Sequence, residues 1–267
     1  MIRHLSLTMF TFAIFFSGCL TLSHENSTWE LVFEENFDGE GAPNPEVWGY
    51  ELGYVRNKEL QLYTNHTDYV YQKDGILNIC AARAEDGKIY SGSIHTLGKQ
   101  DFLYGKIEVR AKLPKGQGVW PAIWMMGVNR SEVRWPYCGE IDIMEYVWGT
   151  PKTVYATCHW WSPQTKKHAR SGSQYASEVV LDGDWHRYTL IWTPTDATFY
   201  FDDIQYAQID LTQAQQMDGS NPFQQPFYLL LNLAIGGGWG GALEESTLPA
   251  LYQIDYVRYW KTSAHQE

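Results

Sequence analysis

Residues 139–145 carry the sequence GEIDIME, in which three carboxylates alternate with large apolar residues. This alternation predicts a strand with one acidic face and one buried face. Glu140 and Asp142 are two residues apart and share a face, but Glu145 would point to the other side of a regular strand. One extra residue in a β-bulge would return Glu145 to the acidic face, and bulges are common next to active sites. We therefore expect a bulged strand with all three acids on one side.

The close spacing of these acids favours a catalytic role. Like charges at close range resist simultaneous ionisation, so a chain carries such a cluster mainly where chemistry requires it. Solvated acids on an edge strand are the alternative, but the apolar Ile141, Ile143 and Met144 argue against it. Two carboxyls facing one groove can cleave a glycosidic bond, because one protonates the leaving oxygen while the other attacks the anomeric carbon or activates a water. A third acid between them can hold a shared proton and separate the two pKa values.

This acidic motif resembles the signature of glycoside hydrolase family 16, in the form with two residues between the Asp and the second Glu. The longer stretch WPYCGEIDIMEYV at residues 135–147 is similar to the laminarinase branch, the endo-β-1,3-glucanases. The resemblance covers residues 29–260, which we expect to form one catalytic domain ending near residue 262. Other segments that match the family in order are residues 56–63, 91–95, 104–111, 120–125, 232–237 and 254–259.

Short strand-like runs recur along the chain between turn signals such as Asp86-Gly87 and Asp182-Gly183. Only residues 212–217 look helical, so the pattern predicts an all-β sandwich. The resemblance implies a jelly roll of two curved antiparallel sheets, with a glycan-binding cleft on the concave face. The clearest strands are expected at residues 76–81, 106–113, 198–202, 228–234 and 252–259.

The charge of the chain restricts its partners. The net charge is −11 and no basic run is present, so nucleic acid and anionic membranes are not expected partners. The same excess of acidic residues disfavours a sulfated polysaccharide and favours a neutral β-glucan as the partner. We expect the protein to be a monomer. The chain has 12 Trp and 18 Tyr, which suit either the faces of sugar rings or the core of a sandwich. We expect most of these rings in the core.

The resemblance implies an endo-acting, retaining enzyme that cleaves β-1,3-glucan (laminarin) by double displacement. In this mechanism Glu140 is the nucleophile, Glu145 is the general acid and then base, and Asp142 tunes their protonation. A mixed-linkage β-1,3/1,4-glucanase is the nearest alternative, and an agarase or carrageenase is a more distant one. A non-catalytic glucan-binding protein is disfavoured, because such proteins lose one or more of the acids.

The resemblance also implies a set of sugar-binding residues. Arg56 and Asn57 are expected to bind hydroxyls on the non-reducing side of the scissile bond. Trp239 lies in a glycine-rich loop, where bare backbone lets a ring reach into a cleft. His159 is expected on the strand that returns from the catalytic one. The full set is Arg56, Asn57, Trp120, Trp124, Trp135, His159 and Trp239.

No cofactor is expected for catalysis, because the histidines show no shared metal-ligand spacing. The resemblance implies a possible structural calcium ion on the convex face, held by Asp255 in the last strand and by the carbonyl of Gly75. Three cysteines follow the N-terminal region, an odd number that forbids full pairing. Cys80, Cys138 and Cys158 are therefore expected to be small buried thiols.

The N-terminus has the pattern of an export signal. Arg3 and His4 precede a short apolar run that ends in FSGC at residues 16–19, which resembles a lipobox. We expect residues 1–18 to be a lipoprotein signal peptide, Cys19 to be lipidated, and residues 19–28 to be a tether. The protein would then be an exported, membrane-anchored bacterial lipoprotein whose only membrane contact is this anchor. An ordinary signal peptide that happens to contain a cysteine is the alternative.

Overall fold

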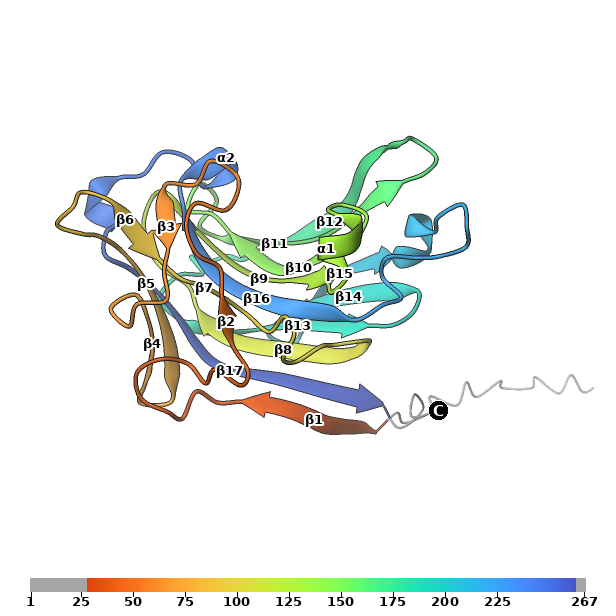
Figure 1. The fold of residues 1–267 in the computed structure, drawn as a ribbon, viewed down its shortest axis with the longest axis horizontal. Coiled ribbons are helices and arrows are strands. Elements are labelled where there is room, and N and C mark those ends of the chain that lie inside the picture. The colour runs from red at the N-terminus through yellow and green to blue at the C-terminus, as the bar shows by residue number, and fades with distance from the viewer. Residues whose placement is uncertain (1–27, 263–267) are drawn as a thin grey trace, which may run out of the picture.

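The computed structural model describes residues 28–262, which form two β-sheets packed face to face (Figure 1). The predicted leader at residues 1–18, the predicted lipidation of Cys19 and the tether up to residue 27 lie outside the described residues. Within residues 28–262, no helix has both the length and the apolar character needed to cross a membrane.

The larger sheet has ten strands. At its edges β1 (Trp29–Glu35) pairs with the last strand, and β4 (Val70–Lys73) pairs with β5. The main path runs in the order β15 (Ile204–Asp210), β14 (Asp196–Phe201), β13 (Trp185–Trp192), β8 (Gly105–Lys112), β17 (Ala250–Thr262), β5 (Ile76–Arg83), β6 (Ile89–Ser91) and β3 (Gln61–Tyr63). Strands β5, β8, β14 and β17 confirm four of the predicted strands.

The smaller sheet has seven strands and carries the predicted acidic segment on its third strand. Its order is β12 (Lys167–Ala176), β11 (Thr153–Ser162), β10 (Glu140–Tyr146), β9 (Val119–Gly127), β16 (Phe227–Ile235), β7 (Ser93–His95) and β2 (Gly49–Tyr50). The predicted strand at residues 228–234 lies within β16. One pairing departs from the predicted antiparallel pattern: β3 and β6 are parallel. A parallel pairing is possible here because β4 and β5 lie between β3 and β6 in the chain and supply the crossover that a parallel pair needs.

The described helices are single turns. The helix predicted at residues 212–217 is a 3-10 turn, η1 (Leu211–Ala214), in which the Asp210 carboxylate accepts a hydrogen bond from the Thr212 amide. The sequence analysis missed α1 (Arg130–Val133), α2 (Gly237–Gly240) and the 3-10 turn η2 (Glu245–Thr247). A single turn is too short to show an apolar period, which explains the omission.

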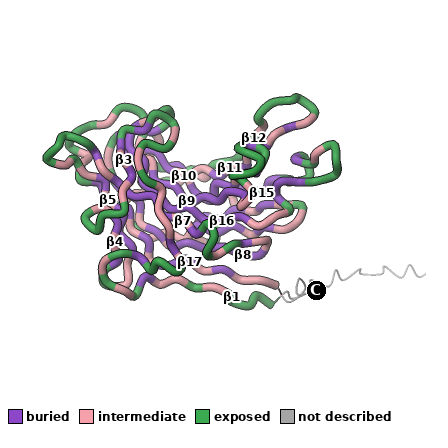
Figure 2. The backbone as a smooth tube through the Cα atoms, viewed as in Figure 1, coloured by how far each residue is buried: buried purple, intermediate pink, exposed green. Residues whose placement is uncertain are grey.

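The core lies between the two sheets, and the central strands are buried along most of their length (Figure 2). Large rings fill it, among them the fully buried Trp48, Trp192, Tyr146 and Phe227. Much of the aromatic content therefore stabilises the sandwich, at roughly 1.5–3 kcal/mol for each large side chain removed from water.

The three described cysteines are free thiols. Cys138 and Cys158 are buried as predicted, but Cys80 is only partly buried. Its neighbours Leu77, Ile79 and Ala81 occupy the inward positions of β5, so the alternation of the strand turns Cys80 outward.

Candidate active site

The catalytic segment forms β10, and the predicted bulge is present. Between Asp142 and Glu145, β10 advances three residues while β11 advances two, from Thr157 to Tyr155. The extra residue lets Ile143 and Met144 both point into the core, where they are 1% and 0% exposed. Glu145 therefore returns to the face of Glu140 and Asp142, as expected for a bulge next to a site.

A glycine leads into this strand. Gly139 has φ +76°, a left-handed conformation that L side chains rarely adopt. A Cβ atom there would lie 2.9 Å from the Phe227 ring and 3.2 Å from Pro222. The tight entry brings the chain out of the preceding loop directly into Glu140, so the first acid begins the strand.

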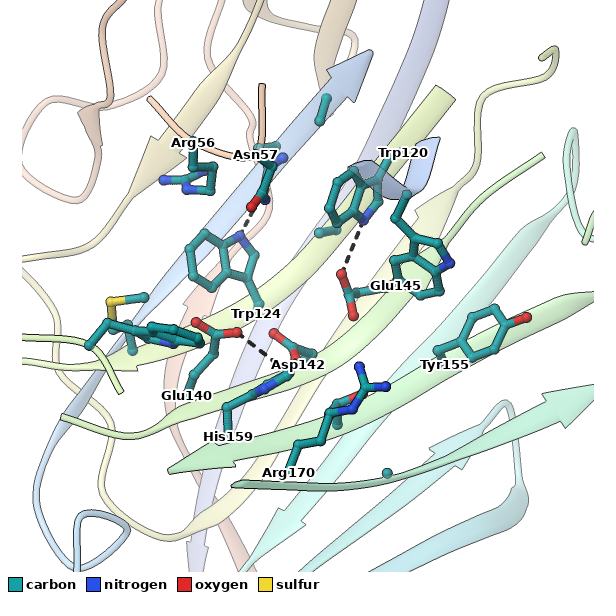
Figure 3. A pocket seen from close by; sticks show the side chains of 18 of the residues that line it. Arg56, Asn57, Trp120, Trp124, Glu140, Asp142, Glu145, Tyr155, His159 and Arg170 are labelled. Atoms are coloured by element: carbon teal, nitrogen blue, oxygen red, sulfur yellow. Dashed lines mark hydrogen bonds and ion pairs between the residues drawn. The ribbon is translucent and has the colours of Figure 1, made fainter. Parts of the chain in front are cut away.

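A cleft of about 1080 Å³ lies over this strand, on the face of the seven-stranded sheet that points away from the core (Figure 3). It crosses the sheet from the loop holding Asn57 at one side to edge strand β12 at the other. All ten residues predicted for catalysis and sugar binding line it: Arg56, Asn57, Trp120, Trp124, Trp135, Glu140, Asp142, Glu145, His159 and Trp239.

The three acids hold protons to unusually high pH. Burial raises the pKa of Glu140 to about 8, and the neighbouring Asp142 adds to the rise. Burial also raises the pKa of Asp142 to about 8. The pKa of Glu145 is raised well above its usual range, first by burial and then by Asp142 and Glu140. The three carboxyls interact strongly, so they titrate as one coupled set.

Glu145 lies against aromatic rings. The Trp120 indole Nε1 donates a hydrogen bond of 3.0 Å to Glu145 Oε1. The Trp120 ring meets Trp239 edge to face, with centroids 5.5 Å apart, and Trp239 meets Tyr155 in the same way at 4.9 Å. Trp239 is nevertheless 39% exposed, so its ring both packs and presents a surface to the cleft.

Trp124 forms the other aromatic wall and is tightly held. Its Nε1 donates a 2.7 Å hydrogen bond to Asn232 Oδ1. The Arg56 guanidinium lies 4.8 Å from the ring centroid and is paired with the Glu51 carboxylate. With its edge hydrogen-bonded and Arg56 over its ring, this indole is only 7% exposed and forms a rigid part of the cleft wall.

A buried carboxylate positions the Asn57 loop. Glu59 accepts hydrogen bonds from Asn57 Nδ2 at 3.1 Å, Gln61 Nε2 at 2.7 Å and the Tyr63 hydroxyl at 3.2 Å. Asn232 Nδ2 donates to the same Tyr63 hydroxyl at 3.0 Å, which connects this network to Trp124. The amide of Asn57 is thereby oriented at the rim of the cleft.

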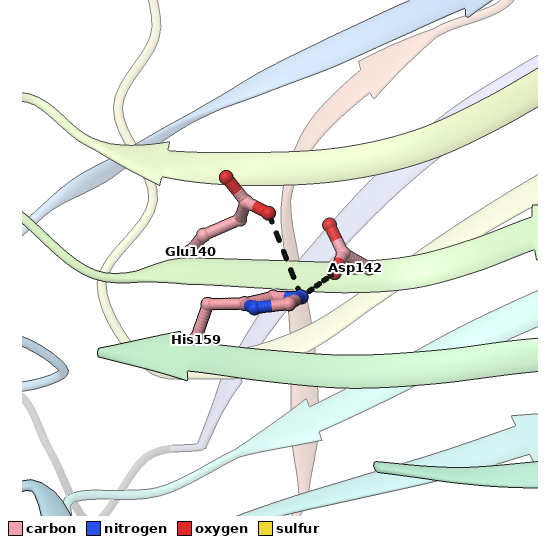
Figure 4. Close-up of side chains that lie close together, drawn as sticks. All are labelled: Glu140, Asp142 and His159. Carbon is pink, nitrogen blue, oxygen red and sulfur yellow. Dashed lines mark ion pairs between the residues drawn. The ribbon is translucent and has the colours of Figure 1, made fainter. Parts of the chain in front are cut away.

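His159 lies beside the acids (Figure 4). Its Nε2 is 3.2 Å from Asp142 Oδ2 and 3.8 Å from Glu140 Oε1. Its Nδ1 is 2.8 Å from Nε2 of His168 on β12, and Trp135 packs against both rings. Burial lowers the pKa of both histidines, and the Arg170 charge contributes in the same direction.

Several cleft residues were not predicted. Glu59 and Asn232 lie inside the matched segments at residues 56–63 and 232–237, so those segments could have identified them. Tyr155 shares a strand face with His159, which was also a usable signal. No local pattern marked three further lining residues, Arg130, His168 and Arg170.

Glu140, Asp142 and His159 are the one group of three His, Cys, Asp or Glu side chains in residues 28–262 whose ligand atoms lie within 4.8 Å of one another. Their place in the cleft is explained by acid–base chemistry without an ion. The predicted structural calcium site stays a prediction. The Asp255 carboxylate is paired with the Arg110 guanidinium, so calcium would have to displace a cation that already neutralises this ligand.

A β-sandwich with three proton-sharing carboxyls on one bulged strand, set in an aromatic-lined cleft, defines a glycoside hydrolase. Comparison with known proteins agrees with this class. Residues 54–258 match glycosyl hydrolases family 16, and the chain belongs to this family of glycosidases.

Proteins similar to this chain include enzymes named for the glycans that they cleave. The beta-glucanase of Rhodothermus marinus is 37% identical over 264 residues, which cover 91% of each chain. The X-ray structure of the laminarinase from Rhodothermus marinus has a TM-score of 0.80 at 35% identity, covering 88% of this chain and 98% of that one. A keratan-sulfate endo-1,4-beta-galactosidase of Sphingobacterium multivorum is 36% identical over 87% of this chain and 55% of its own length.

Proposed function

We propose that this protein is an endo-acting, retaining β-1,3-glucanase. The observation that carries the proposal is the bulged strand, which places Glu140, Asp142 and Glu145 together on the floor of a cleft that crosses the sheet. A polymer can lie across such a cleft from the Asn57 loop to β12 and be cut within its length. The relatives named beta-glucanase and laminarinase support β-1,3-glucan as the polymer.

The first step forms a covalent intermediate. Protonated Glu145 gives its proton to the glycosidic oxygen, while ionised Glu140 attacks the anomeric carbon. The raised pKa of Glu145 suits a group that must carry a proton at neutral pH. As its proton leaves, the hydrogen bond from Trp120 stabilises the carboxylate that forms.

The second step reverses the proton transfer. Glu145, now ionised, takes a proton from a water molecule, and the resulting hydroxide displaces the sugar from Glu140. Asp142 lies between the two glutamates in the strand and shares their face. Its negative charge resists ionisation of both neighbours, so its own protonation decides how readily Glu140 becomes a nucleophile.

A second candidate is an enzyme for a β-galactoside polymer that carries anionic groups. Its support is Arg170, which is exposed in the cleft and forms no ion pair within the described part of the chain. The keratan-sulfate enzyme among the relatives agrees with this candidate. Against this candidate, Arg56 of the same cleft is already paired with Glu51.

Product analysis on a substrate panel tests the proposal. Laminarin should be hydrolysed at least as fast as lichenan or barley β-glucan, with oligosaccharides present from the earliest times. Lichenan cleavage with laminarin left intact would favour the mixed-linkage alternative. Cleavage confined to keratan sulfate, agarose or carrageenan would overturn the β-glucanase assignment altogether.

We also propose that the mature protein is an exported lipoprotein that acts as a monomer. The support is the sequence FSGC at residues 16–19, which lies outside the described residues. Several acyl chains would be needed, because a single chain gives only marginal membrane binding. Cys19→Ala should release the protein from the membrane fraction or block its maturation, and unchanged membrane association would end this proposal.

A further inference from the structure

Beyond the three acids, two histidines form a chain that leads from the buried site to the edge of the sheet. His159 Nε2 lies 3.2 Å from Asp142 Oδ2, and His159 Nδ1 lies 2.8 Å from His168 Nε2. We propose that His159 and His168 form a proton path between Asp142 and solvent, and that His168 is a positioning residue which controls proton exchange at Asp142. This inference rests on the proposed function, because it concerns the same acids.

One end of the path is buried and the other is exposed, as proton exchange with solvent requires. Asp142 is 3% exposed, and its Oδ2 accepts no aligned hydrogen bond from the described residues. The His159 Nε2 atom lies 3.2 Å from this unsatisfied oxygen, which is within reach for proton transfer. His168, in contrast, is an exposed residue on edge strand β12. Asp142 therefore reaches water through two rings.

Each imidazole carries a proton on one nitrogen and accepts on the other, so the pair has two matched tautomeric states. When Asp142 is protonated, it donates to His159 Nε2, His159 Nδ1 donates to His168 Nε2, and His168 Nδ1–H faces solvent. A concerted shift moves one proton along each link and releases the proton of His168 Nδ1 to water. Asp142 is then ionised, both rings are neutral in the opposite tautomer, and one proton has left the site.

The reaction gives a reason for such exchange in every cycle. In the resting enzyme the negative charge of Glu140 discourages ionisation of Asp142. Formation of the glycosyl ester removes that charge and leaves Glu145 ionised instead, and hydrolysis of the ester reverses both changes. The negative charge next to Asp142 therefore moves between the two glutamates in every cycle, and the protonation of Asp142 adjusts at each step. A path to water lets the proton leave and return without passing through the bound sugar.

Burial favours neutral rings, as this path requires, and lowers the pKa of both histidines; the Glu140 carboxylate opposes this effect at His159, and the Arg170 charge adds to it at both rings. His159 Nε2 faces the carboxyls of β10, and Arg170 of β12 is the cation that acts on both imidazoles. Trp135 contacts both rings with its uncharged indole. The other charged groups around the cleft are Arg56, Glu59, Arg130 and Glu145, with Lys167 next to His168 in the chain.

A measurement that needs no substrate tests the path directly. Nitrogen-15 NMR of the imidazoles should show both rings changing tautomer together as the pH passes through the pKa of Asp142, about 8. In Asp142→Asn the rings should keep one tautomer across the same range. Rings that keep a single tautomer in the wild-type protein would overturn the path, whatever the enzyme cleaves.

Kinetics then separate proton exchange from simple packing. His168→Gln can keep a hydrogen bond to His159 Nδ1 but cannot pass a proton on, whereas His168→Phe keeps the ring and loses the hydrogen bond. We expect kcat on laminarin to fall about tenfold in both, with the alkaline limb of the pH profile shifted and KM changed much less. Added imidazole should restore kcat to His168→Ala. The control is His66→Gln, an exposed histidine paired with Asp68 outside the cleft, which should match the wild type.

The outcomes are decisive in both directions. A His168→Gln profile that superimposes on the wild type, or a lack of imidazole rescue in a folded His168→Ala, would overturn the role of His168. Absence of laminarin cleavage by the wild-type enzyme would instead overturn the proposed function, and the NMR result would still decide whether the path exists.

Discussion

The indole Nε1 of Trp120 donates a 3.0 Å hydrogen bond to Oε1 of Glu145, and it is the one hydrogen bond that the described residues give to this carboxyl. An N–H donor stabilises the ionised carboxylate, so this bond lowers the pKa of Glu145 against the larger raising effect of burial. Burial therefore favours the protonated form of Glu145, and the hydrogen bond from Trp120 makes loss of that proton easier.

Trp120→Phe tests this balance. Loss of the donor should raise the pKa of Glu145 further, so the alkaline limb of kcat/KM should move to higher pH. A hydrogen bond to a charged group contributes roughly 1.5 kcal/mol, which corresponds to about one pH unit. The pH profile of laminarin hydrolysis measures the shift.

Trp239→Phe is the matched comparison, because Trp239 contacts Trp120 and lines the cleft but donates no hydrogen bond to Glu145. It should raise KM without moving the alkaline limb. Equal shifts in both variants would mean that the limb responds to aromatic packing and not to the hydrogen bond.

Asp142→Asn should lower the pKa of both glutamates, because the charge of Asp142 raises them. The alkaline limb should move to lower pH, and kcat should fall by about 100-fold, near the lower end of acid–base effects. Circular dichroism should show a folded chain, since Asn nearly matches Asp in size. A limb that stays in place would show that Asp142 does not act through its charge.

The same acids should make stability depend on pH. Glu140 and Asp142 have folded-state pKa values of about 8, above their usual values near 4.5 and 3.8. Acids with raised pKa values in the folded state stabilise it below the unfolded pKa, and this contribution is lost as pH rises through about 8. Thermal unfolding should therefore give a lower Tm at alkaline pH, and Asp142→Asn should reduce the slope. A Tm that rises from acidic to alkaline pH would contradict this.

The extent to which the site could be predicted follows from where its residues lie in the sequence. Glu140, Asp142 and Glu145 are neighbours in one strand, and their spacing alone predicted the bulge that the structure shows. His168 and Arg170 reach the cleft only through the pairing of β12 with β11. Strand β12 is an edge strand with no buried residue, so no apolar alternation marked it. Spacing within one strand therefore predicted the three acids. His168 and Arg170 enter the cleft through strand pairing, which the spacing of residues within β12 does not reveal.

Azide rescue distinguishes the two glutamates. Glu140→Ala should lose several orders of magnitude in activity on laminarin, because no other group can form the glycosyl-enzyme. With an activated aryl β-glycoside, azide should restore turnover and yield the α-glycosyl azide. Glu145→Ala should instead yield the β-glycosyl azide, since its covalent intermediate still forms. Exchanged stereochemistry in the two variants would reverse the assignment, and a first-formed α-anomer from the wild type would mean inversion.

The bulge itself can be removed by deleting Met144. Deletion leaves the order Glu, Ile, Asp, Ile, Glu, which alternates regularly, so the second glutamate keeps its place opposite Tyr155 without an extra residue. Ile143 and Tyr146 would still point into the core. We therefore expect a folded enzyme that keeps its retaining mechanism and loses about 2–5 kcal/mol of stability with the buried Met144 side chain.

Met144→Ala is the matched control, because it removes most of the same side chain and leaves the bulge in place. Similar Tm values in the two variants would show that the bulge adds little stability of its own.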